Sequence, residues 1–123
     1  MRDIEVTLGG KELRLAADFK ASLEIAKKVG DPLTIMREAA LETALISRGI
    51  PYDPKWRFTV ENVLELIHIG TQRADQRISR DEIGELIFAA GFLAAKEVAS
   101  DYLAIIVGPR PEEIGEKGSG EGN

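Results

Sequence analysis

The chain begins with two runs of alternating apolar and polar residues on either side of a Gly-Gly pair. The apolar positions of the two runs are Ile4, Val6, Leu8, Leu13 and Leu15. Because glycine tolerates the positive φ of a tight turn, Gly9-Gly10 predicts a two-residue hairpin in which Val6 lies opposite Leu13. Side chains alternate between the two faces of a strand, so one face of this hairpin is apolar. An isolated hairpin is marginally stable in water, and we expect the rest of the chain to cover that face.

After the hairpin, the apolar residues recur at helical spacing. The predicted helices, with their flanking residues, run from Asp18 to Gly30, from Asp31 to Gly49, from Thr59 to Gly70, and from Ser79 to about Val107. Asp, Ser and Thr side chains accept hydrogen bonds from first-turn N–H groups, and Ser79 with Glu82 matches a capping box. The last pattern would form a helix of about 28 residues, roughly 42 Å long, so we expect a bend or break near Gly91 or Ser100.

Each predicted helix carries a stripe of apolar residues. The stripes consist of Phe19, Leu23, Ala26 and Val29; Leu33, Met36, Ala40, Ala44 and Leu45; Val60, Val63, Leu64 and Ile67; and Ile83, Leu86, Ile87, Ala90 and Ala94. Residues 50–58 contain two prolines and three aromatic residues, which indicates an irregular but packed connection.

The predicted fold is α+β and mostly α. A β-hairpin over 1–16 packs on a bundle of about four helices over 18–107, and the two form one domain, 1–107. Residues 108–123 are rich in glycine, proline and charge, with one isolated isoleucine, and predict a disordered tail.

Composition narrows the range of partners. The chain has 123 residues, 44% of them hydrophobic, and a net charge of −5. It has 14 basic and 17 acidic residues over 1–108 and 2 basic and 4 acidic residues over 109–123, so neither part is a polycation. Phosphate binding draws on clustered Lys and Arg, and we expect no nucleic-acid partner. No signal-peptide pattern or membrane-length apolar run is present, so we expect no membrane partner either.

The sequence offers few groups for catalysis or metal binding. It contains no cysteine, and His68 is its single histidine. A multi-histidine metal site is therefore excluded, and a catalytic triad would have to include His68, which fits a structural role in its helix better. A calcium-binding loop does not fit either, because too few calcium ligands are present among Asp75, Arg77, Ser79 and Asp81. We expect no catalytic residue, cofactor or metal, and a protein that is not an enzyme.

Two groups of side chains are candidates for partner contacts. Residues 86–95 are apolar on all sides, which is typical of a central core helix or of a helix with one face against another chain. The candidates in this region are Phe88, Phe92, Tyr102 and Ile106, with Trp56 and Phe58 as a second group, and each also fits a place in the core. Arg73, Arg77 and Arg80 form a small basic cluster that we expect to pair with carboxylates or to contact a protein partner.

Several segments resemble a family of small proteins from tailed phages and gene transfer agents. The family is grouped with the tail assembly chaperones and is sometimes labelled tail tube proteins. The resemblance covers about 1–107. Three segments carry it. The first is Leu8-Gly9-Gly10-Lys11-Glu12-Leu13-Arg14-Leu15, followed by Phe19; the second is Phe58-Thr59-Val60-Glu61-Asn62-Val63, followed by Ile67-His68-Ile69-Gly70; the third is Asp81-Glu82-Ile83-Gly84-Glu85, which precedes Gly91.

The resemblance implies a non-enzymatic tail assembly chaperone. Such a protein binds the tape-measure protein in the bacterial host cytoplasm during tail morphogenesis and is able to self-associate as a homo-oligomer. Two alternatives stay open: a structural tail protein, tube or connector, which would be found in the virion, and a small helical regulatory protein.

Overall fold

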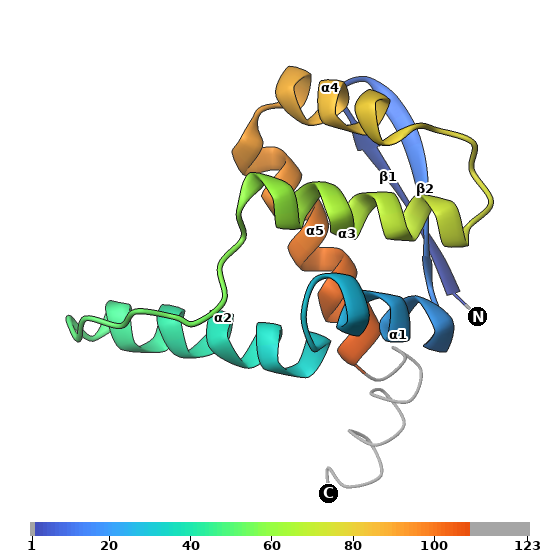
Figure 1. Cartoon of the computed structure of the whole chain (residues 1–123). Coiled ribbons are helices and arrows are strands. Elements are labelled where there is room, and N and C mark those ends of the chain that lie inside the picture. Colours follow the sequence, from blue (N-terminus) through green and yellow to red (C-terminus); the bar gives the residue numbers. More distant parts are fainter. Residues whose placement is uncertain (1, 109–123) are drawn as a thin grey trace, which may run out of the picture.

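The computed structural model describes residues 2–108 (Figure 1). The predicted disordered tail, 108–123, lies outside the described residues except for Gly108. The elements in chain order are β1 Arg2–Leu8, β2 Lys11–Ala17, α1 Phe19–Lys28, α2 Pro32–Ser47, α3 Val60–Arg73, α4 Arg80–Ala90 and α5 Phe92–Val107. The fold is α+β and mostly α, as the sequence predicts, with five helices in the described part of the chain.

The hairpin has the predicted register. β1 and β2 pair antiparallel with Val6 opposite Leu13, and both glycines of the turn have positive φ, 59° at Gly9 and 84° at Gly10. Leu13 and Leu15 on the apolar face are fully buried. The hairpin is therefore a one-sided sheet whose apolar face packs on the helices, chiefly on α3.

Helix α3 lies at the centre of the molecule. In Figure 1 it runs between α4 above and α1 below, and it packs against β2, α1, α4 and α5. Its glycine, Gly70, lets these elements approach closely: a Cβ there would lie 2.9 Å from the Cβ of Leu15 and 3.2 Å from the Cζ of Tyr102. The Tyr102 hydroxyl donates a hydrogen bond of 2.6 Å to the carbonyl oxygen of Ala16. The hairpin, α3 and α5 are thus joined at one buried point.

The predicted helix starts are confirmed. Asp18, Asp31, Thr59 and Ser79 each accept a hydrogen bond from a first-turn backbone N–H, and Ser79 with Glu82 forms the complete capping box. The long predicted fourth helix breaks at Gly91, whose φ of 96° favours glycine, and it does not break at Ser100. The expected four helices are therefore five.

A side chain from the α3–α4 connection covers the outer edge of β2. The Gln76 Oε1 accepts a hydrogen bond of 2.8 Å from the Arg14 N–H, and its Nε2 donates one of 3.1 Å to the Glu12 carbonyl. An uncovered strand edge offers the same groups to another chain. Gln76 therefore occupies part of the outer edge of β2.

The close packing at Gly70 gives a stability prediction with a matched control. Gly70→Ala should lower the free energy of unfolding by about 1–3 kcal/mol, because its new methyl group meets Leu15. Gly84→Ala in α4 meets nothing within 4 Å and should raise the free energy of unfolding by up to about 1 kcal/mol. Urea denaturation of both variants tests this. An unchanged Gly70→Ala protein would contradict the packing described.

Candidate functional site

The structure separates the predicted partner contacts into exposed and buried groups. Phe88 on α4 is 88% exposed, whereas Phe92 and Ile106 on α5 are half-buried against the core. Tyr102 is fully buried, and its hydroxyl is bonded to Ala16. Its prediction as a partner contact is wrong, because a side chain enclosed by the hairpin, α3 and α5 presents no surface. Of these four, Phe88 alone is exposed as a surface contact.

Trp56 and Phe58 form a pair that fixes the 50–58 connection to the body. Their rings meet edge to face with centroids 4.8 Å apart, and the Trp56 Nε1 donates a hydrogen bond of 3.3 Å to the carbonyl of Val29. The Lys96 Nζ lies 5.8 Å from the Phe58 ring centroid. Both rings are half-buried. They hold the packed connection that the sequence predicts and also line a hollow beside α2.

Helix α2 projects from the body as an arm (Figure 1). Ile35 and Ile46 are eleven positions apart and so lie on the same side of the helix. Ile35 is 1% exposed in the core, whereas Ile46 is 54% exposed, because the helix extends past the elements that cover its first turns. With 16 residues, α2 is about 24 Å long. Its C-terminal half therefore leaves apolar side chains in solvent.

A second side of α2 is open along its whole length. Leu33, Ala40 and Ala44 share this side, and all three are exposed, with Leu33 at 67%. Alanine side chains are short enough to let another helix approach closely. We call the exposed apolar residues of this arm and of the turn that follows it the arm surface; they are Leu33, Ala40, Ala44 and Ile46 in the helix and Ile50 just after it.

A buried carboxylate holds the returning connection against α2. Glu38 accepts a hydrogen bond of 3.0 Å from the Lys55 N–H and one of 2.8 Å from the Tyr52 hydroxyl. These donors stabilise the charged form and lower the pKa of Glu38 below its ordinary value of 4.5. The same contact raises the pKa of Tyr52. Glu38 thus shapes one side of the arm and leaves the arm surface free.

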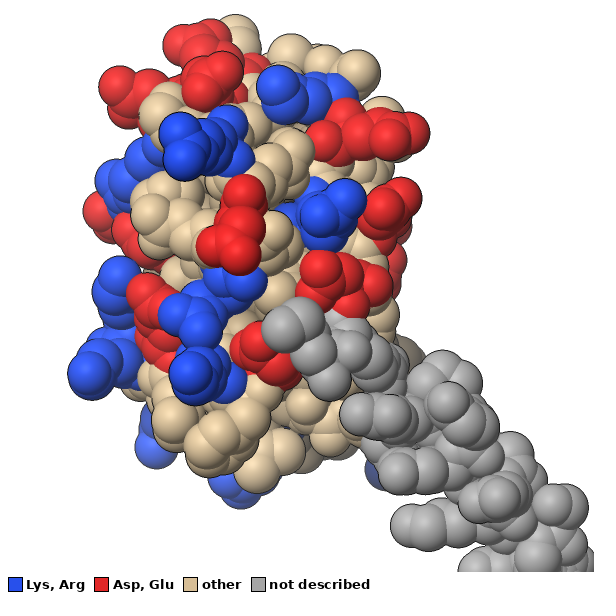
Figure 2. Space-filling model, turned by 90° about the vertical axis from the view of Figure 1, so that its right-hand side faces the viewer, with Lys and Arg blue, Asp and Glu red and all other residues tan. Residues whose placement is uncertain are grey.

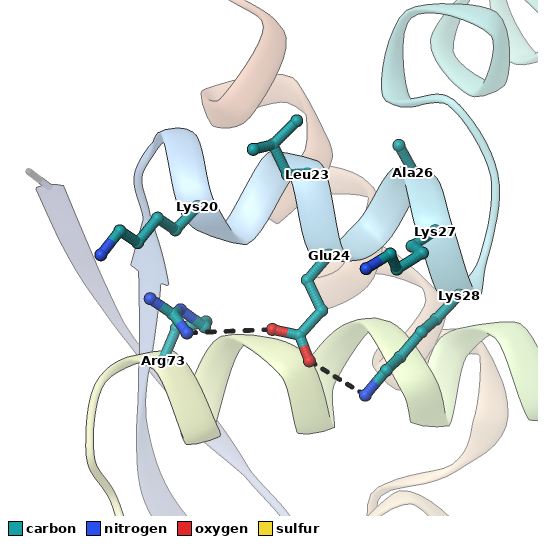
Figure 3. A pocket seen from close by; sticks show the side chains of 7 residues that line it. All are labelled: Lys20, Leu23, Glu24, Ala26, Lys27, Lys28 and Arg73. Atoms are coloured by element: carbon teal, nitrogen blue, oxygen red, sulfur yellow. Dashed lines mark ion pairs between the residues drawn. The ribbon is translucent and has the colours of Figure 1, made fainter.

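A basic hollow lies beside α1 (Figure 3). Its volume is about 630 Å³, and its lining residues are Lys20, Leu23, Glu24, Ala26, Lys27, Lys28 and Arg73. Glu24 lies between two basic side chains: its Oε2 is 2.9 Å from the Lys28 Nζ, and its Oε1 is 4.0 Å from the Arg73 Nη1. No carboxylate among residues 2–108 forms an ion pair with Lys20 or Lys27. Two lysines at this site are therefore available to an acidic partner.

The predicted basic cluster is mostly paired within the chain. Arg73 lies near Glu24, and Arg80 forms an ion pair with Glu65, while Arg77 is exposed. His68 is half-buried and lines a shallow hollow with Glu65 and Arg80. Two of the three arginines thus lie beside carboxylates of the chain, whereas the structural role expected for His68 stays a prediction.

Sequence reasoning did not find the arm surface or Glu38. It placed Leu33, Ala40 and Ala44 in one apolar stripe but had no means to tell whether that stripe or the side bearing Ile35 is buried. The useful signal is that α2 has apolar residues on every side, so one small core is unable to cover them all. Glu38, a carboxylate inside an apolar stretch, indicates a buried hydrogen-bonded acid.

Neither a metal-binding group nor a membrane span occurs in residues 2–108. No three His, Cys, Asp or Glu side chains gather closely enough there to hold a metal ion. None of the helices described combines the length and the apolar character needed to cross a membrane.

The Glu38 contacts predict a pH-dependent effect on stability. Its lowered pKa means that the ionised carboxylate stabilises the fold above pH 4.5 and that this contribution is lost as the pH falls through the folded-state pKa. Glu38→Gln should lower the melting temperature at pH 7, and the difference from wild type should shrink below pH 4.5. Glu97→Gln, at an exposed site on α5, is the control. A Glu38→Gln difference that stays constant with pH would contradict this assignment.

Comparisons with protein-family models, curated proteins and solved structures give no match for this chain. The family resemblance seen in the sequence therefore stays a prediction.

Proposed function

We propose that this protein is a non-enzymatic assembly chaperone of the phage-tail type that binds a tape-measure protein through the arm surface of α2. The observation that carries the proposal is a projecting helix with apolar residues exposed along its length, Leu33, Ala40 and Ala44 on one side and Ile46 on another. Under this proposal the protein works in the bacterial host cytoplasm.

The shape of the arm fits an extended helical partner. Helices recognise grooves and other helices through apolar side chains repeated at i, i+3, i+4 and i+7. Leu33, Ala40 and Ala44 follow this spacing over about three turns. A long apolar helix that packs on them would be shielded from water along the same length, which is what keeps an aggregation-prone partner in solution.

Two other properties of the chain support a chaperone that binds a partner rather than an enzyme. The hollow beside α1 is lined in part by side chains that pair with each other, such as Glu24 with Lys28. The net charge of −5 favours solubility of a complex that carries apolar helices.

The proposal predicts that co-expression with a tape-measure protein raises the soluble fraction of that protein and yields a co-purifying complex. Ala40→Arg/Ala44→Arg should abolish co-purification, because bulky charged side chains block helix approach. Both sites are exposed, so the melting temperature should stay within a few degrees of wild type. Ala104→Arg, an exposed alanine on α5, is the matched control and should still bind.

Two results would contradict the proposal. Failure of the wild-type protein to bind the tape-measure protein or raise its solubility would remove the chaperone function. Abundance of the protein in finished particles, measured by mass spectrometry, would show a structural tail component instead.

A further inference from the structure

The outer face of α1 combines exposed apolar and basic residues. Phe19, 74% exposed, and Leu23 lie beside Lys20 and Lys27. Most of the predicted stripe of this helix therefore faces solvent, and only Val29 packs partly against the core. The buried side of α1 consists of Ala21 and Ile25. We define the α1 face by its exposed residues, which are Phe19, Lys20, Leu23, Ala26 and Lys27.

The outer face of α4 has the same construction with the opposite charge. Phe88 is its exposed aromatic residue, and Asp81 and Glu85 lie seven and three positions before it, on the same side of the helix. The buried side of α4 consists of Ile83 and Ile87. We define the α4 face by Asp81, Glu82, Glu85, Phe88 and Ala89, all of which are exposed.

The two faces lie at opposite ends of the molecule. In Figure 1, α3 separates α4 from α1, and it packs on both helices. Figure 2 shows acidic side chains at the top of one face of the molecule, the end where α4 lies, with basic ones just below them, and basic side chains together with acidic ones toward the bottom, the end where α1 lies. A single chain is therefore unable to bring its own α1 face onto its own α4 face.

We propose that the α1 face of one copy binds the α4 face of a second copy, so that copies associate head to tail. Lys20 and Lys27 would meet carboxylates of the α4 face, and Phe19 and Leu23 would pack near Phe88. Such a pair keeps one free face of each kind, the α4 face of the first copy and the α1 face of the second. A heterologous contact of this type continues into a ring or an open filament.

Charge also selects against the symmetric arrangements. Two α1 faces would place lysines against lysines, and two α4 faces would place carboxylates against carboxylates. Like charges across an interface disfavour the wrong pairing, so both isologous dimers are disfavoured. The head-to-tail contact is the arrangement that is complementary in both charge and apolar surface.

The test is the mass distribution of the purified full chain by analytical ultracentrifugation, without any other protein. We expect the average mass to rise from micromolar to millimolar concentration and to fall when salt is raised from about 0.05 M to about 0.5 M, because exposed charge pairs are screened. Lys20→Glu/Lys27→Glu and Asp81→Lys/Glu85→Lys should each weaken association by roughly tenfold or more. Arg48→Glu/Lys55→Glu, outside both faces, is the control for the lysine variant, because it makes the same change in net charge.

Mixing the two charge-reversed variants distinguishes head-to-tail pairing from other modes. In Lys20→Glu/Lys27→Glu both faces are acidic, and in Asp81→Lys/Glu85→Lys both faces are basic. Each face of one variant is therefore complementary to a face of the other, so an equimolar mixture should recover the association that each variant loses alone. If Asp81→Lys weakens the start of α4, Glu85→Lys alone serves in the same mixture. Three results would overturn the proposal: a monomer at every concentration in low salt, a concentration-independent dimer, or a mixture that does not recover association. None depends on binding a tape-measure protein.

Discussion

The whole arrangement depends on the close contact of α3 with the hairpin and α5 at Gly70. The absence of a side chain there lets Leu15 and Tyr102 approach the α3 backbone, and the Tyr102 hydroxyl satisfies the Ala16 carbonyl in the same buried place. An unpaired buried carbonyl would cost about 1–3 kcal/mol, so the tyrosine serves both packing and hydrogen bonding. The apolar face of the hairpin is covered at this point, and the remaining helices are arranged around it.

A core centred on α3 is too small to cover every apolar side chain of the surrounding helices. α1 and α4 each turn two of their residues fully inward, Ala21 with Ile25 and Ile83 with Ile87, and leave an aromatic residue outside. α2 has its fully buried residues in its first half and is only partly covered in its second half. The exposed apolar surfaces are thus a consequence of how the core is built, and they are the parts of the molecule available for binding.

Local features of the fold could be predicted from the sequence, whereas the choice of buried face could not. The Gly-Gly turn set the hairpin register, the capping residues set the helix starts, and Gly91 marked the break, because each of these acts through neighbouring backbone atoms. The apolar stripe of α1 could be recognised in the sequence, but whether it faces the core or solvent depends on which side of α1 packs on α3. Tyr102 is a similar case, because the sequence pattern around an aromatic residue is the same whether its side chain is buried in the core or lies at an interface.

The outer half of α2 is only partly covered in the single chain, whereas α3 is held at the core. Native-state hydrogen exchange in dilute, monomeric solution measures this directly. We expect α3 amides near Gly70 to exchange only through global unfolding, and amides of 40–47 to exchange at least about a hundredfold faster through local opening. Equal protection of the two segments would contradict the claim, because it would mean that the arm is held as firmly as the core.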